Sequence, residues 1–382
     1  MLRAMEAAAD VLVVGGGVVG LACAAALARE GRSVALVERH AGPGRETSSR
    51  NSGVVHAGLY YPPGSRKALL CAEGRERLYA RCEALGIPHR RTGKLVVATN
   101  ERERGSLESI AERARANGAG AIHLIDAKEL AAREPLLRSV AALVSPESGI
   151  VDAHSLVASL ASECRSLGVA LAFRTTLEAL SRSTSGWRAE VVDPDARRTT
   201  LEAEVVVDSA GLECDRVASL AGLDVDALGV RIAPCKGDYF ALHESAPRPT
   251  TPLVYPVPDG PGLGIHLTTD LAGQRLAGPD ATYVDAPSYE VDEGKRSVFA
   301  ESIRRYLPGL RDEHLAPAYA GVRPKLAGGS GLGKDFVVEE CSPHGAPGFV
   351  LLAGIESPGL TASLALGARV AEIVRGRQIT RS

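Results

Sequence analysis

The chain has 382 residues, with 44 Lys and Arg against 46 Asp and Glu, and 45% of its residues are hydrophobic. This length exceeds one typical core and predicts two domains of an ordinary globular protein. The net charge of −2 gives no reason to expect a nucleic-acid partner, and seven scattered cysteines without a C-x-x-C pair predict reduced thiols and no structural zinc site or disulfide framework.

The N-terminal segment has the pattern of a βαβ dinucleotide-binding unit. The apolar run 11–14 ends in Gly15-Gly16-Gly17-Val18-Val19-Gly20, and a second apolar run, 34–37, ends at Glu38. Gly15 permits the tight turn, Gly17 lets the backbone approach a pyrophosphate, and Gly20 lets the following helix pack closely on the strand. The helix N-terminus favours an anion, while the acid suits ribose hydroxyls and disfavours a 2′-phosphate. The pattern therefore predicts FAD or NAD and not NADP.

The uncharged stretch 11–28 is long enough to suggest a membrane span or a signal peptide. Its internal glycines and strand-like start argue against both, and the ten residues before it lack a basic segment. We therefore expect a cytoplasmic protein, and peripheral association with the inner face of the membrane is compatible with this expectation.

The rest of the chain predicts a second α/β region and a mostly antiparallel layer. Helices are expected over 18–29, 66–85, 101–117, 126–133, 154–167, 291–306 and 363–375. Strands are expected over 94–99, 122–125, 169–173, 187–192, 200–202, 204–208, 238–242, 253–257, 264–267, 274–278, 320–323, 335–339 and 349–353. The predicted fold class is α/β (α+β), with a Rossmann-like cofactor domain built from 1–86, 149–211 and 331–382. Residues 87–148 and 212–330 are assigned to an antiparallel-sheet substrate domain.

The segment Thr47–Ser65 distinguishes FAD from NAD. NAD-binding folds pass directly from the second strand to the next βα unit, whereas a polar loop containing Thr47, Ser48, Asn51 and Ser52 intervenes here. This loop resembles that of the D-amino-acid-oxidase-like flavoproteins, where it covers the pyrophosphate and passes under the isoalloxazine. The resemblance implies FAD as cofactor and an FAD-binding domain of the glutathione-reductase type.

Three further segments carry the same resemblance. Ser209-Ala210-Gly211 is similar to the superfamily's strand-end turn, and 321–324, Gly-Val-Arg-Pro, is similar to the strand whose arginine binds substrate. The segment 353–361 resembles its C-terminal flavin loop. The residues that this reading assigns to FAD are Gly15, Gly17, Val18, Val19, Gly20, Glu38, Arg39, Thr47, Ser48, Asn51, Ser52, Gly53, Ser209, Ala210, Gly211, Gly354, Ser357, Pro358, Gly359, Leu360 and Thr361.

Within the superfamily the chain most resembles the L-2-hydroxyglutarate dehydrogenases, through the blocks 51–61, 93–98, 236–239, 255–259 and 264–268. The resemblance implies oxidation of L-2-hydroxyglutarate to 2-oxoglutarate by hydride transfer to flavin N5. FAD-type glycerol-3-phosphate dehydrogenases carry an arginine where this chain has Tyr60, which argues against a phosphorylated substrate. A flavin amino-acid oxidase or dehydrogenase is the alternative, and a non-catalytic FAD-folded partner protein is a second one.

The chemistry of a 2-hydroxy acid identifies candidate catalytic residues. Arg323 supplies a planar, bidentate clamp for a carboxylate. His56, in the flavin loop, and His266, in the substrate layer, are equal candidates for the base that accepts the hydroxyl proton. The remaining histidines show no metal-ligand spacing, so no metal is expected.

Further residues are candidates for substrate binding and for the pocket wall. Tyr60, Tyr61 and Ser357 are placed at the substrate, and the second carboxylate of a five-carbon diacid needs a cation, for which Lys236, Lys325 and Lys94 are the candidates. No second nucleotide fingerprint is present in the sequence, so we expect a quinone, an electron-transfer protein or oxygen as electron acceptor.

Overall fold

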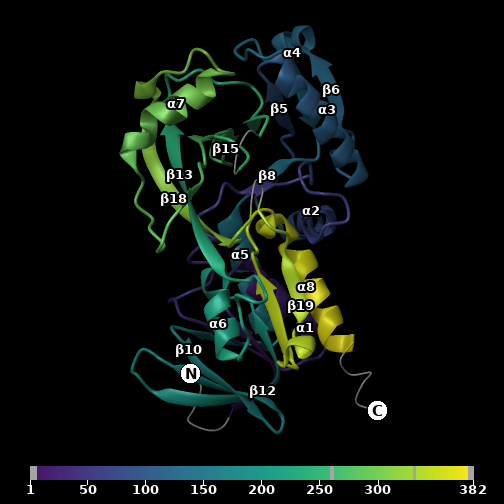
Figure 1. The fold of residues 1–382 in the computed structure, drawn as a ribbon, viewed down its shortest axis with the longest axis vertical. Coiled ribbons are helices and arrows are strands. Elements are labelled where there is room, and N and C mark those ends of the chain that lie inside the picture. The colour runs from purple at the N-terminus through teal and green to yellow at the C-terminus, as the bar shows by residue number, and fades with distance from the viewer. Residues whose placement is uncertain (1–6, 259–261, 330–332, 377–382) are drawn as a thin grey trace.

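The computed structural model describes residues 7–258, 262–329 and 333–376, and its two main sheets lie one above the other along the long axis (Figure 1). The lower sheet has the strand order β10-β11-β12-β1-β2-β9, with β20 paired to β12 and β19 to β20. Its strands are β1 (Ala7–Val14), β2 (Val34–Glu38), β9 (Ala170–Phe173), β10 (Thr176–Ser183), β11 (Gly186–Val192), β12 (Arg198–Asp208), β19 (Val337–Glu340) and β20 (Phe349–Ala353).

The parallel centre of the lower sheet explains its apolar runs. β1 pairs in parallel with both β2 and β12, so its side chains are buried on both faces. Val11 and Val13 belong to the core beneath the helices, whereas Leu12 and Val14 belong to the core on the opposite face. The helices on the first face are α1 (Val18–Arg29), α2 (Arg66–Leu85), α5 (Ala153–Ser166) and α8 (Gly359–Gly376).

Two glycines allow α8 to pack unusually close to its neighbours. A Cβ atom on Gly367 would lie 2.5 Å from the carbonyl oxygen of Ala22 in α1. A Cβ atom on Gly74 in α2 would lie 2.4 Å from the carbonyl oxygen of Thr361. Helix α8 is therefore packed on both α1 and α2, with its N-terminal turn against α2.

The upper sheet is antiparallel except for the parallel pair β5 and β14. Its order is β17-β13-β16-β15-β14-β5-β7-β6, with β18 paired to β13. The strands are β5 (Lys94–Ala98), β6 (His123–Asp126), β7 (Ala141–Ser145), β13 (Ile232–Leu242), β14 (Val254–Pro256), β15 (Leu267–Thr269), β16 (Arg275–Ala277), β17 (Thr282–Tyr283) and β18 (Leu315–Leu326). Helices α3 (Glu101–Ala116), α4 (Ala127–Arg133) and α7 (Arg296–Arg304) accompany this sheet.

The remaining elements connect the two sheets. A small third sheet joins β3 (Val54–Val55), β8 (Gly149–Val151) and β4 (His89–Arg90). The long ribbon of β13 and β18 extends from the upper sheet towards the lower one (Figure 1). Short 3₁₀ turns occupy Gly211–Glu213, Glu293–Lys295, Asp312–His314 and Ser342–His344.

The predicted α/β class, with a Rossmann-like sheet and a mostly antiparallel second sheet, is confirmed. Several elements differ from expectation. β7, β10 and α6 (Cys214–Leu220) were not expected, and α8 begins at Gly359 and not at Ser363. Helix α6 packs on the lower sheet through Cys214 and Val217, beyond the expected boundary at residue 211. The residue ranges of the two domains stay a prediction, and the ends 1–6 and 377–382 lie outside the described residues.

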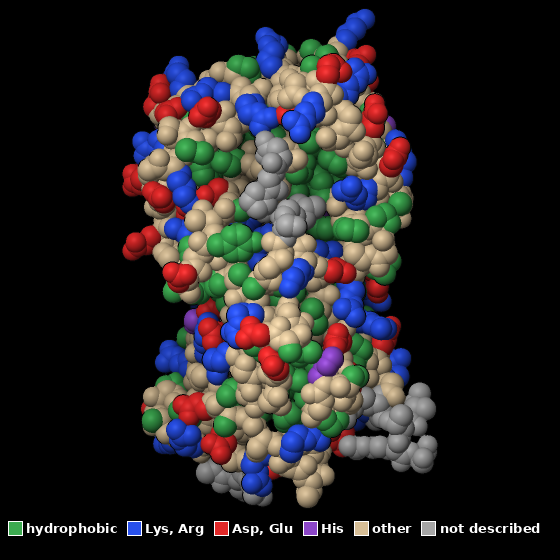
Figure 2. Space-filling view, in the orientation of Figure 1, with side chains coloured by type: hydrophobic (Ala, Val, Ile, Leu, Met, Phe, Trp, Pro, Cys, Tyr) green, Lys and Arg blue, Asp and Glu red, His purple; other side chains and the backbone are tan. Residues whose placement is uncertain are grey.

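The surface agrees with the balanced composition. Acidic and basic side chains are interspersed over the face shown in Figure 2. All seven cysteines are buried and free. In the part of the chain that the structure describes, no helix is long and apolar enough to cross a bilayer.

Candidate active site

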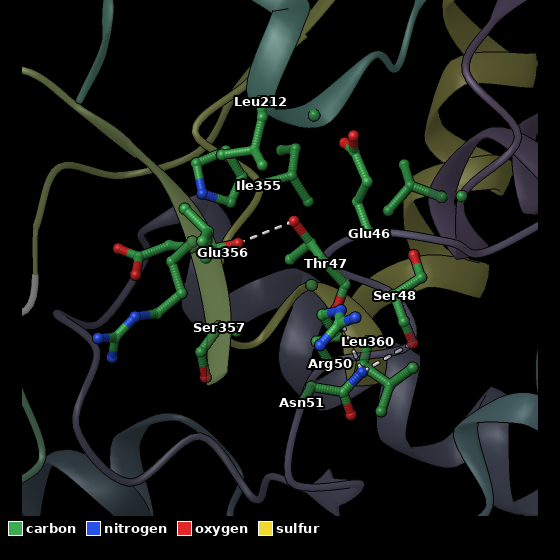
Figure 3. A pocket seen from close by; sticks show the side chains of 18 of the residues that line it. Glu46, Thr47, Ser48, Arg50, Asn51, Leu212, Ile355, Glu356, Ser357 and Leu360 are labelled. Carbon is green, nitrogen blue, oxygen red and sulfur yellow. Dashed lines mark hydrogen bonds between the residues drawn. The ribbon is translucent and has the colours of Figure 1, made fainter. Parts of the chain in front are cut away.

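A cavity of about 510 Å³ collects residues from both sheets. Its walls are formed by the β1–α1 turn, the end of β2, the polar loop that follows it, the turn after β12, the β13–β18 ribbon and the loop before α8. Thr47, Ser48 and Asn51 lie across the cavity from Ile355 and Ser357 (Figure 3).

The β1–α1 turn needs two of its glycines for backbone packing. Gly15 has φ +103°, and a Cβ atom there would lie 2.6 Å from the carbonyl oxygen of Ser209. A Cβ atom on Gly20 would lie 2.0 Å from the carbonyl oxygen of Gly15. Gly17 differs, because its φ of −71° suits any residue, and a Cβ atom there would meet only the Ser48 hydroxyl, at 3.0 Å. The missing side chain of Gly17 therefore leaves space in the cavity at the α1 N-terminus, as a pyrophosphate requires.

Gly17→Val is expected to give folded protein that contains no FAD, because the side chain occupies the space in front of the helix N-terminus. The visible flavin absorbance and the far-UV circular dichroism of the purified variant measure the two effects separately. Gly20→Ala is the matched control, in which the clash with Gly15 is expected to impair folding itself. A yellow Gly17→Val protein with parental FAD content would contradict the assignment of this turn.

The cavity also carries the acid expected for a ribose. Glu38 accepts hydrogen bonds from the backbone N–H of Gly16 and of His40, both at 2.7 Å. These bonds hold the carboxylate at the end of β2, beside the start of α1. Arg39 also lines the cavity and pairs with Glu46 at 2.5 Å.

The polar loop after β2 is anchored to strand β18 of the upper sheet and to the start of helix α1. The Thr47 hydroxyl donates to the carbonyl of Val322 at 2.9 Å, and the Ser48 hydroxyl accepts from the N–H of Val18 at 3.0 Å. The Asn51 amide donates to the carbonyl of Ser48 at 2.8 Å, and its carbonyl accepts from Gly53 at 2.9 Å. The loop is therefore fixed in place as one wall of the cavity.

Most of the predicted cofactor residues line this cavity: Gly15, Gly17, Val18, Val19, Glu38, Arg39, Thr47, Ser48, Asn51, Ser52, Ser209, Ala210, Gly211, Ser357, Pro358, Gly359 and Leu360. Gly20, Gly53, Gly354 and Thr361 are not among the lining residues. They shape the backbone behind it: Gly53 and Gly354 have φ of +65° and +69°, and the Thr361 hydroxyl accepts from the N–H of His56. The glycine turn, the acid and the α1 N-terminus, whose N-cap residue Gly17 supplies no capping side chain, fit the expected FAD.

Arg323 lies on β18 opposite Cys235 and lines the cavity. Its Nη2 donates to the carbonyls of Asp280 at 2.6 Å and Lys236 at 3.2 Å, and its Nε donates to the carbonyl of Cys235 at 3.3 Å. Neutral acceptors orient the guanidinium in this way, while no carboxylate of the described residues pairs with it. A fixed, unneutralised cation of this kind is suited to an anionic ligand.

His266 directly precedes β15 and is 4% exposed. Its ring stacks on Tyr255, with the centroids 3.7 Å apart, and its Nδ1 lies 2.9 Å from the carbonyl of Gly264. Since a carbonyl accepts, Nδ1 carries the proton and Nε2 presents a lone pair. Burial lowers the pKa of His266 to about 3, so the imidazole is neutral at physiological pH.

His56 faces the C-terminal loop. Its Nε2 lies 3.2 Å from the Ser357 hydroxyl, and its backbone N–H donates to Thr361 at 3.1 Å. Burial, followed by the nearby charges of Lys94 and His266, holds the pKa of His56 well below its usual value. The structure thus brings both candidate histidines to one cavity, together with Tyr61 and Ser357.

The four remaining substrate candidates separate into two groups. Lys325 lines the cavity, and its Nζ lies 3.6 Å from Glu356, whose other oxygen accepts from Lys67 at 3.0 Å. Lys236, Lys94 and Tyr60 are not among the lining residues. Lys236 pairs with Asp238 at 3.2 Å on the side away from the cavity lining, and Tyr60 is buried in the upper core.

Lys94 carries a buried amine with no hydrogen-bond partner among the described residues. Its Nζ lies 4.0 Å from the centroid of the Tyr255 ring. Because His266 stacks flat on Tyr255, the amine must lie over the opposite face of that ring. Burial lowers the pKa of Lys94 to about 7.

Lys94→Met is expected to stabilise the protein at neutral pH. In the unfolded chain the lysine stays charged up to about pH 10.4, whereas in the folded protein it is charged only below about pH 7. Burying the charged amine therefore destabilises the fold fully below about pH 7, and this destabilisation fades between about pH 7 and pH 10. The gain in free energy of unfolding is expected to reach several kcal/mol, about 1.4 kcal/mol per pKa unit, and to fade by about pH 10. Denaturant unfolding of the parent and of Lys94→Met at about pH 7 and about pH 10 tests the expected gain. Lys128→Met, at an exposed position, is the control. A destabilised Lys94→Met protein at pH 7 would contradict it.

Tyr239, Tyr255 and Glu356 are among the cavity residues that were not singled out from the sequence. Tyr239 stacks on Tyr319 with the centroids 4.5 Å apart, and the Tyr319 hydroxyl donates to the carbonyl of Asn51. Tyr239 and Tyr255 lie inside the blocks 236–239 and 255–259 that carry the family resemblance, so those blocks were the signal available for them. Asp259, the last residue of the second block, lies outside the described residues.

Comparisons with known proteins agree with this geometry. The family model "FAD dependent oxidoreductase" (DAO) matches residues 10–373. The mitochondrial L-2-hydroxyglutarate dehydrogenase of Arabidopsis thaliana is 38% identical, over 95% of this chain and 82% of that protein. The L-2-hydroxyglutarate dehydrogenase of Escherichia coli is 29% identical, over 96% of this chain and 93% of that protein.

Solved structures show the same fold. The FAD-bound L-α-glycerophosphate oxidase of Mycoplasma pneumoniae superimposes with a TM-score of 0.86 and 27% identity, covering 97% of this chain and 95% of that one. The glycine oxidase of Geobacillus kaustophilus gives 0.81 and 24% identity, covering 97% and 95%. The chain therefore belongs to the DAO family of FAD-dependent oxidoreductases, which confirms the fold and the cofactor expected from its sequence.

Proposed function

We propose that the protein oxidises L-2-hydroxyglutarate to 2-oxoglutarate. The observation that carries this proposal is that Arg323 and His266 line the same cavity. They place an unneutralised cation and a neutral imidazole at one site, and the relatives of this chain include L-2-hydroxyglutarate dehydrogenases. When bound, FAD supplies the acceptor for the two electrons and the hydrogen of the substrate Cα.

Arg323 holds the carboxylate next to the hydroxyl carbon. Three carbonyls fix Nε and Nη2, so the guanidinium plane is set before the substrate arrives and little rotational freedom is lost on binding. The two N–H groups of Nη1 are the guanidinium donors that remain for carboxylate oxygens.

His266 is the proton acceptor in this proposal. The Gly264 carbonyl holds its Nδ1 proton, so Nε2 can take the hydroxyl proton as the C=O bond forms. The Nε2 atom of His56 is already shared with Ser357 on the flavin loop. We therefore assign His56 and Ser357 to the orientation of the cofactor and substrate.

Lys325 is the proposed partner of the second carboxylate. It follows Arg323 by two residues on β18, and successive alternate residues of a strand lie on one face. Glu356 is shared between Lys325 and Lys67, so two lysine amines meet one carboxylate at the cavity wall. A dicarboxylate would be bound between Arg323 and Lys325.

Lys325→Met is expected to lower kcat/KM for L-2-hydroxyglutarate by about tenfold to a hundredfold, the value of one charged hydrogen bond. The same variant should act on L-2-hydroxypentanoate, which lacks the second carboxylate, at the parental kcat/KM. Steady-state kinetics with both acids measure the difference, and the exposed Lys334→Met serves as control. Equal losses on both acids would rule out a role in distal carboxylate recognition.

Anaerobic mixing tests the reaction itself. L-2-hydroxyglutarate is expected to bleach the flavin absorbance, whereas the D enantiomer and the common amino acids are expected to leave it unchanged. Bleaching by an amino acid and not by the hydroxy acid would replace the proposal with an amino-acid oxidase or dehydrogenase. A quinone, an electron-transfer protein or oxygen as final acceptor stays a prediction.

A further inference from the structure

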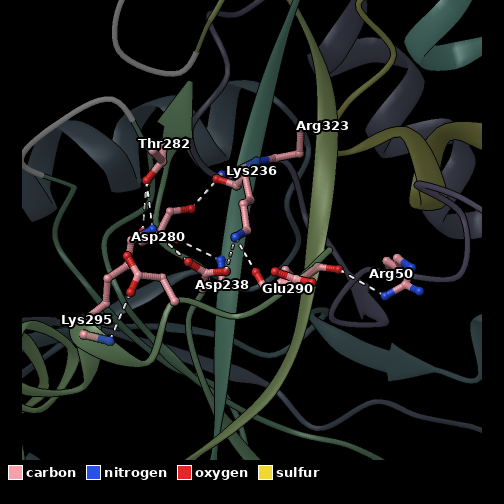
Figure 4. Close-up of polar contacts among 11 residues, drawn as sticks. Arg50, Lys236, Asp238, Asp280, Thr282, Glu290, Lys295 and Arg323 are labelled. Carbon is pink, nitrogen blue, oxygen red and sulfur yellow. Dashed lines mark hydrogen bonds and ion pairs between the residues drawn. The ribbon is translucent and has the colours of Figure 1, made fainter. Parts of the chain in front are cut away.

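A buried ionic network lies behind Arg323, on the side of the β13–β18 ribbon that holds Asp238 (Figure 4). The Asp238 side chain is fully buried and pairs with Lys295 at 2.7 Å and with Lys236 at 3.2 Å. Lys236 is also tied to the carbonyl of Glu290. Two lysine side chains therefore flank one buried carboxylate behind the proposed carboxylate clamp.

Asp280 connects this network to the cavity. Its Oδ1 accepts from the backbone N–H of Asp238 at 2.8 Å, and its Oδ2 pairs with Lys295 at 2.7 Å and accepts from Thr282 at 3.2 Å. Its backbone carbonyl accepts from Nη2 of Arg323 at 2.6 Å, the shortest of the bonds that hold the guanidinium. The side chain of Asp280 is held by the network while its backbone holds Arg323.

Lys295 is the group that joins the two carboxylates. Its Nζ contacts Asp238, Asp280 and Thr282 at 2.7, 2.7 and 3.0 Å. Without this ammonium, the carboxylates of Asp238 and Asp280 would face one another with a weaker counter-charge, and like charges at this separation repel. The Asp280 segment would then shift, and with it the carbonyl that orients Arg323.

We propose that Lys295 is a positioning residue for substrate binding, which fixes the Asp280 carbonyl and thereby the orientation of the Arg323 guanidinium. The inference rests on the proposed role of Arg323 as carboxylate clamp. Bidentate recognition depends on the angle of the guanidinium plane, so a small rotation costs affinity without removing a charge.

Lys295 takes no part in the apolar packing that holds the following helix, α7. It ends the 3₁₀ turn Glu293–Lys295, and its side chain is 22% exposed. The following helix α7 is anchored in the upper core by Phe299, Ala300 and Ile303. A substitution at Lys295 therefore leaves the apolar anchor of α7 unchanged.

The test compares Lys295→Met and Lys295→Arg in the FAD-loaded enzyme. Lys295→Met is expected to raise KM for L-2-hydroxyglutarate about tenfold, with kcat within about threefold of the parent and the FAD content unchanged. Lys295→Arg, which restores a cation, is expected to recover most of the parental KM. Arg304→Met is the matched control: it removes an exposed ion pair between the last residue of α7 and Asp312 in a later 3₁₀ turn, and it should leave KM unchanged.

The double variant Lys295→Met/Arg323→Met separates the inference from the proposed function. If Lys295 acts through Arg323, the double variant should have the KM of Arg323→Met alone, because the effects are not additive. Additive effects, or a parental KM in Lys295→Met, would overturn the positioning role. A parental KM in Arg323→Met would instead overturn the proposed clamp. If Lys295→Met does not fold, Lys295→Gln keeps a hydrogen-bond donor, and a parental KM in it would equally overturn the inference.

Discussion

Replacing His266 by alanine is expected to slow flavin reduction by L-2-hydroxyglutarate by roughly 10²- to 10⁴-fold, the usual contribution of a general base. The variant should retain FAD, because the contacts of His266 are to Tyr255 and to the carbonyl of Gly264, away from the β1–α1 turn. Anaerobic stopped-flow absorbance measures the reduction rate directly. The deficit should be partly relieved at high pH, where solvent removes the hydroxyl proton.

The pH dependence of the parent provides a second test of the same assignment. Burial lowers the pKa of His266 to about 3, so its neutral form prevails throughout the physiological range. Loss of activity through protonation of this base is therefore expected only on approach to that pKa, and not near the ordinary value of about 6.5. A fall in activity below about pH 6.5 that disappears in His266→Ala would show that the imidazole is more exposed to water than its burial indicates.

His56→Ala is the matched control for His266→Ala. Because His56 contacts Ser357 and Thr361 on the flavin loop, its loss is expected to weaken FAD binding or shift the flavin spectrum. If His56→Ala slows reduction with its spectrum intact while His266→Ala reduces at the parental rate, the two roles are reversed. If both variants reduce at the parental rate, neither histidine is the base.

Arg323→Lys is expected to weaken substrate binding by about tenfold to a hundredfold, which corresponds to about 1.5–3 kcal/mol for a charged hydrogen bond. The lysine keeps the charge, but a single ammonium cannot bond the carbonyls of Cys235 and Asp280 and still present a planar edge to the substrate. FAD affinity should be unchanged, because the assigned FAD contacts lie on other segments of the cavity.

The dissociation constant of 2-oxoglutarate, followed through its perturbation of the flavin spectrum, measures the effect of Arg323→Lys without turnover. Arg231→Lys is a suitable control, since Arg231 forms an exposed pair with Asp226 outside the cavity lining. Parental affinity for 2-oxoglutarate in Arg323→Lys would show that the substrate carboxylate is bound elsewhere.

Local sequence patterns determined the elements whose signals are short-ranged. The predicted helices 18–29 and 66–85 and the predicted strand 349–353 have the observed bounds. The helix 66–85 begins after Ser65, whose hydroxyl caps the N–H of Ala68, and ends at Gly86 with a φ of +64°. Capping and apolar periodicity are properties of neighbouring residues, so they can be recognised without the rest of the fold.

Elements with weak local signals were missed. β10 (Thr176–Ser183) is largely polar and exposed, and it pairs as the outer strand of a meander on β11. β7 is a short Ala-rich run, and such a run does not distinguish a buried strand from a helix. The start of α8 at Gly359 was placed too late, because the family resemblance assigned residues 353–361 to a loop, and glycine itself has a low helix preference. The packing of α8 against α1 and α2 outweighs that local preference.

The amino-acid sequence by itself determined the cofactor class, the family and the short list of chemical groups: a clamp, two histidines and three lysines. Only the tertiary structure shows where they lie relative to the cavity. It placed Lys325 at the cavity, left Lys236 and Lys94 out of its lining, and set the tautomer of His266 through the Gly264 carbonyl. The physical reason is that a motif restricts the backbone nearby, whereas the surroundings of a side chain depend on segments that meet only after folding. The contact between His56 and Ser357, 301 residues apart in the chain, exists only because the sheets and helices bring their loops together.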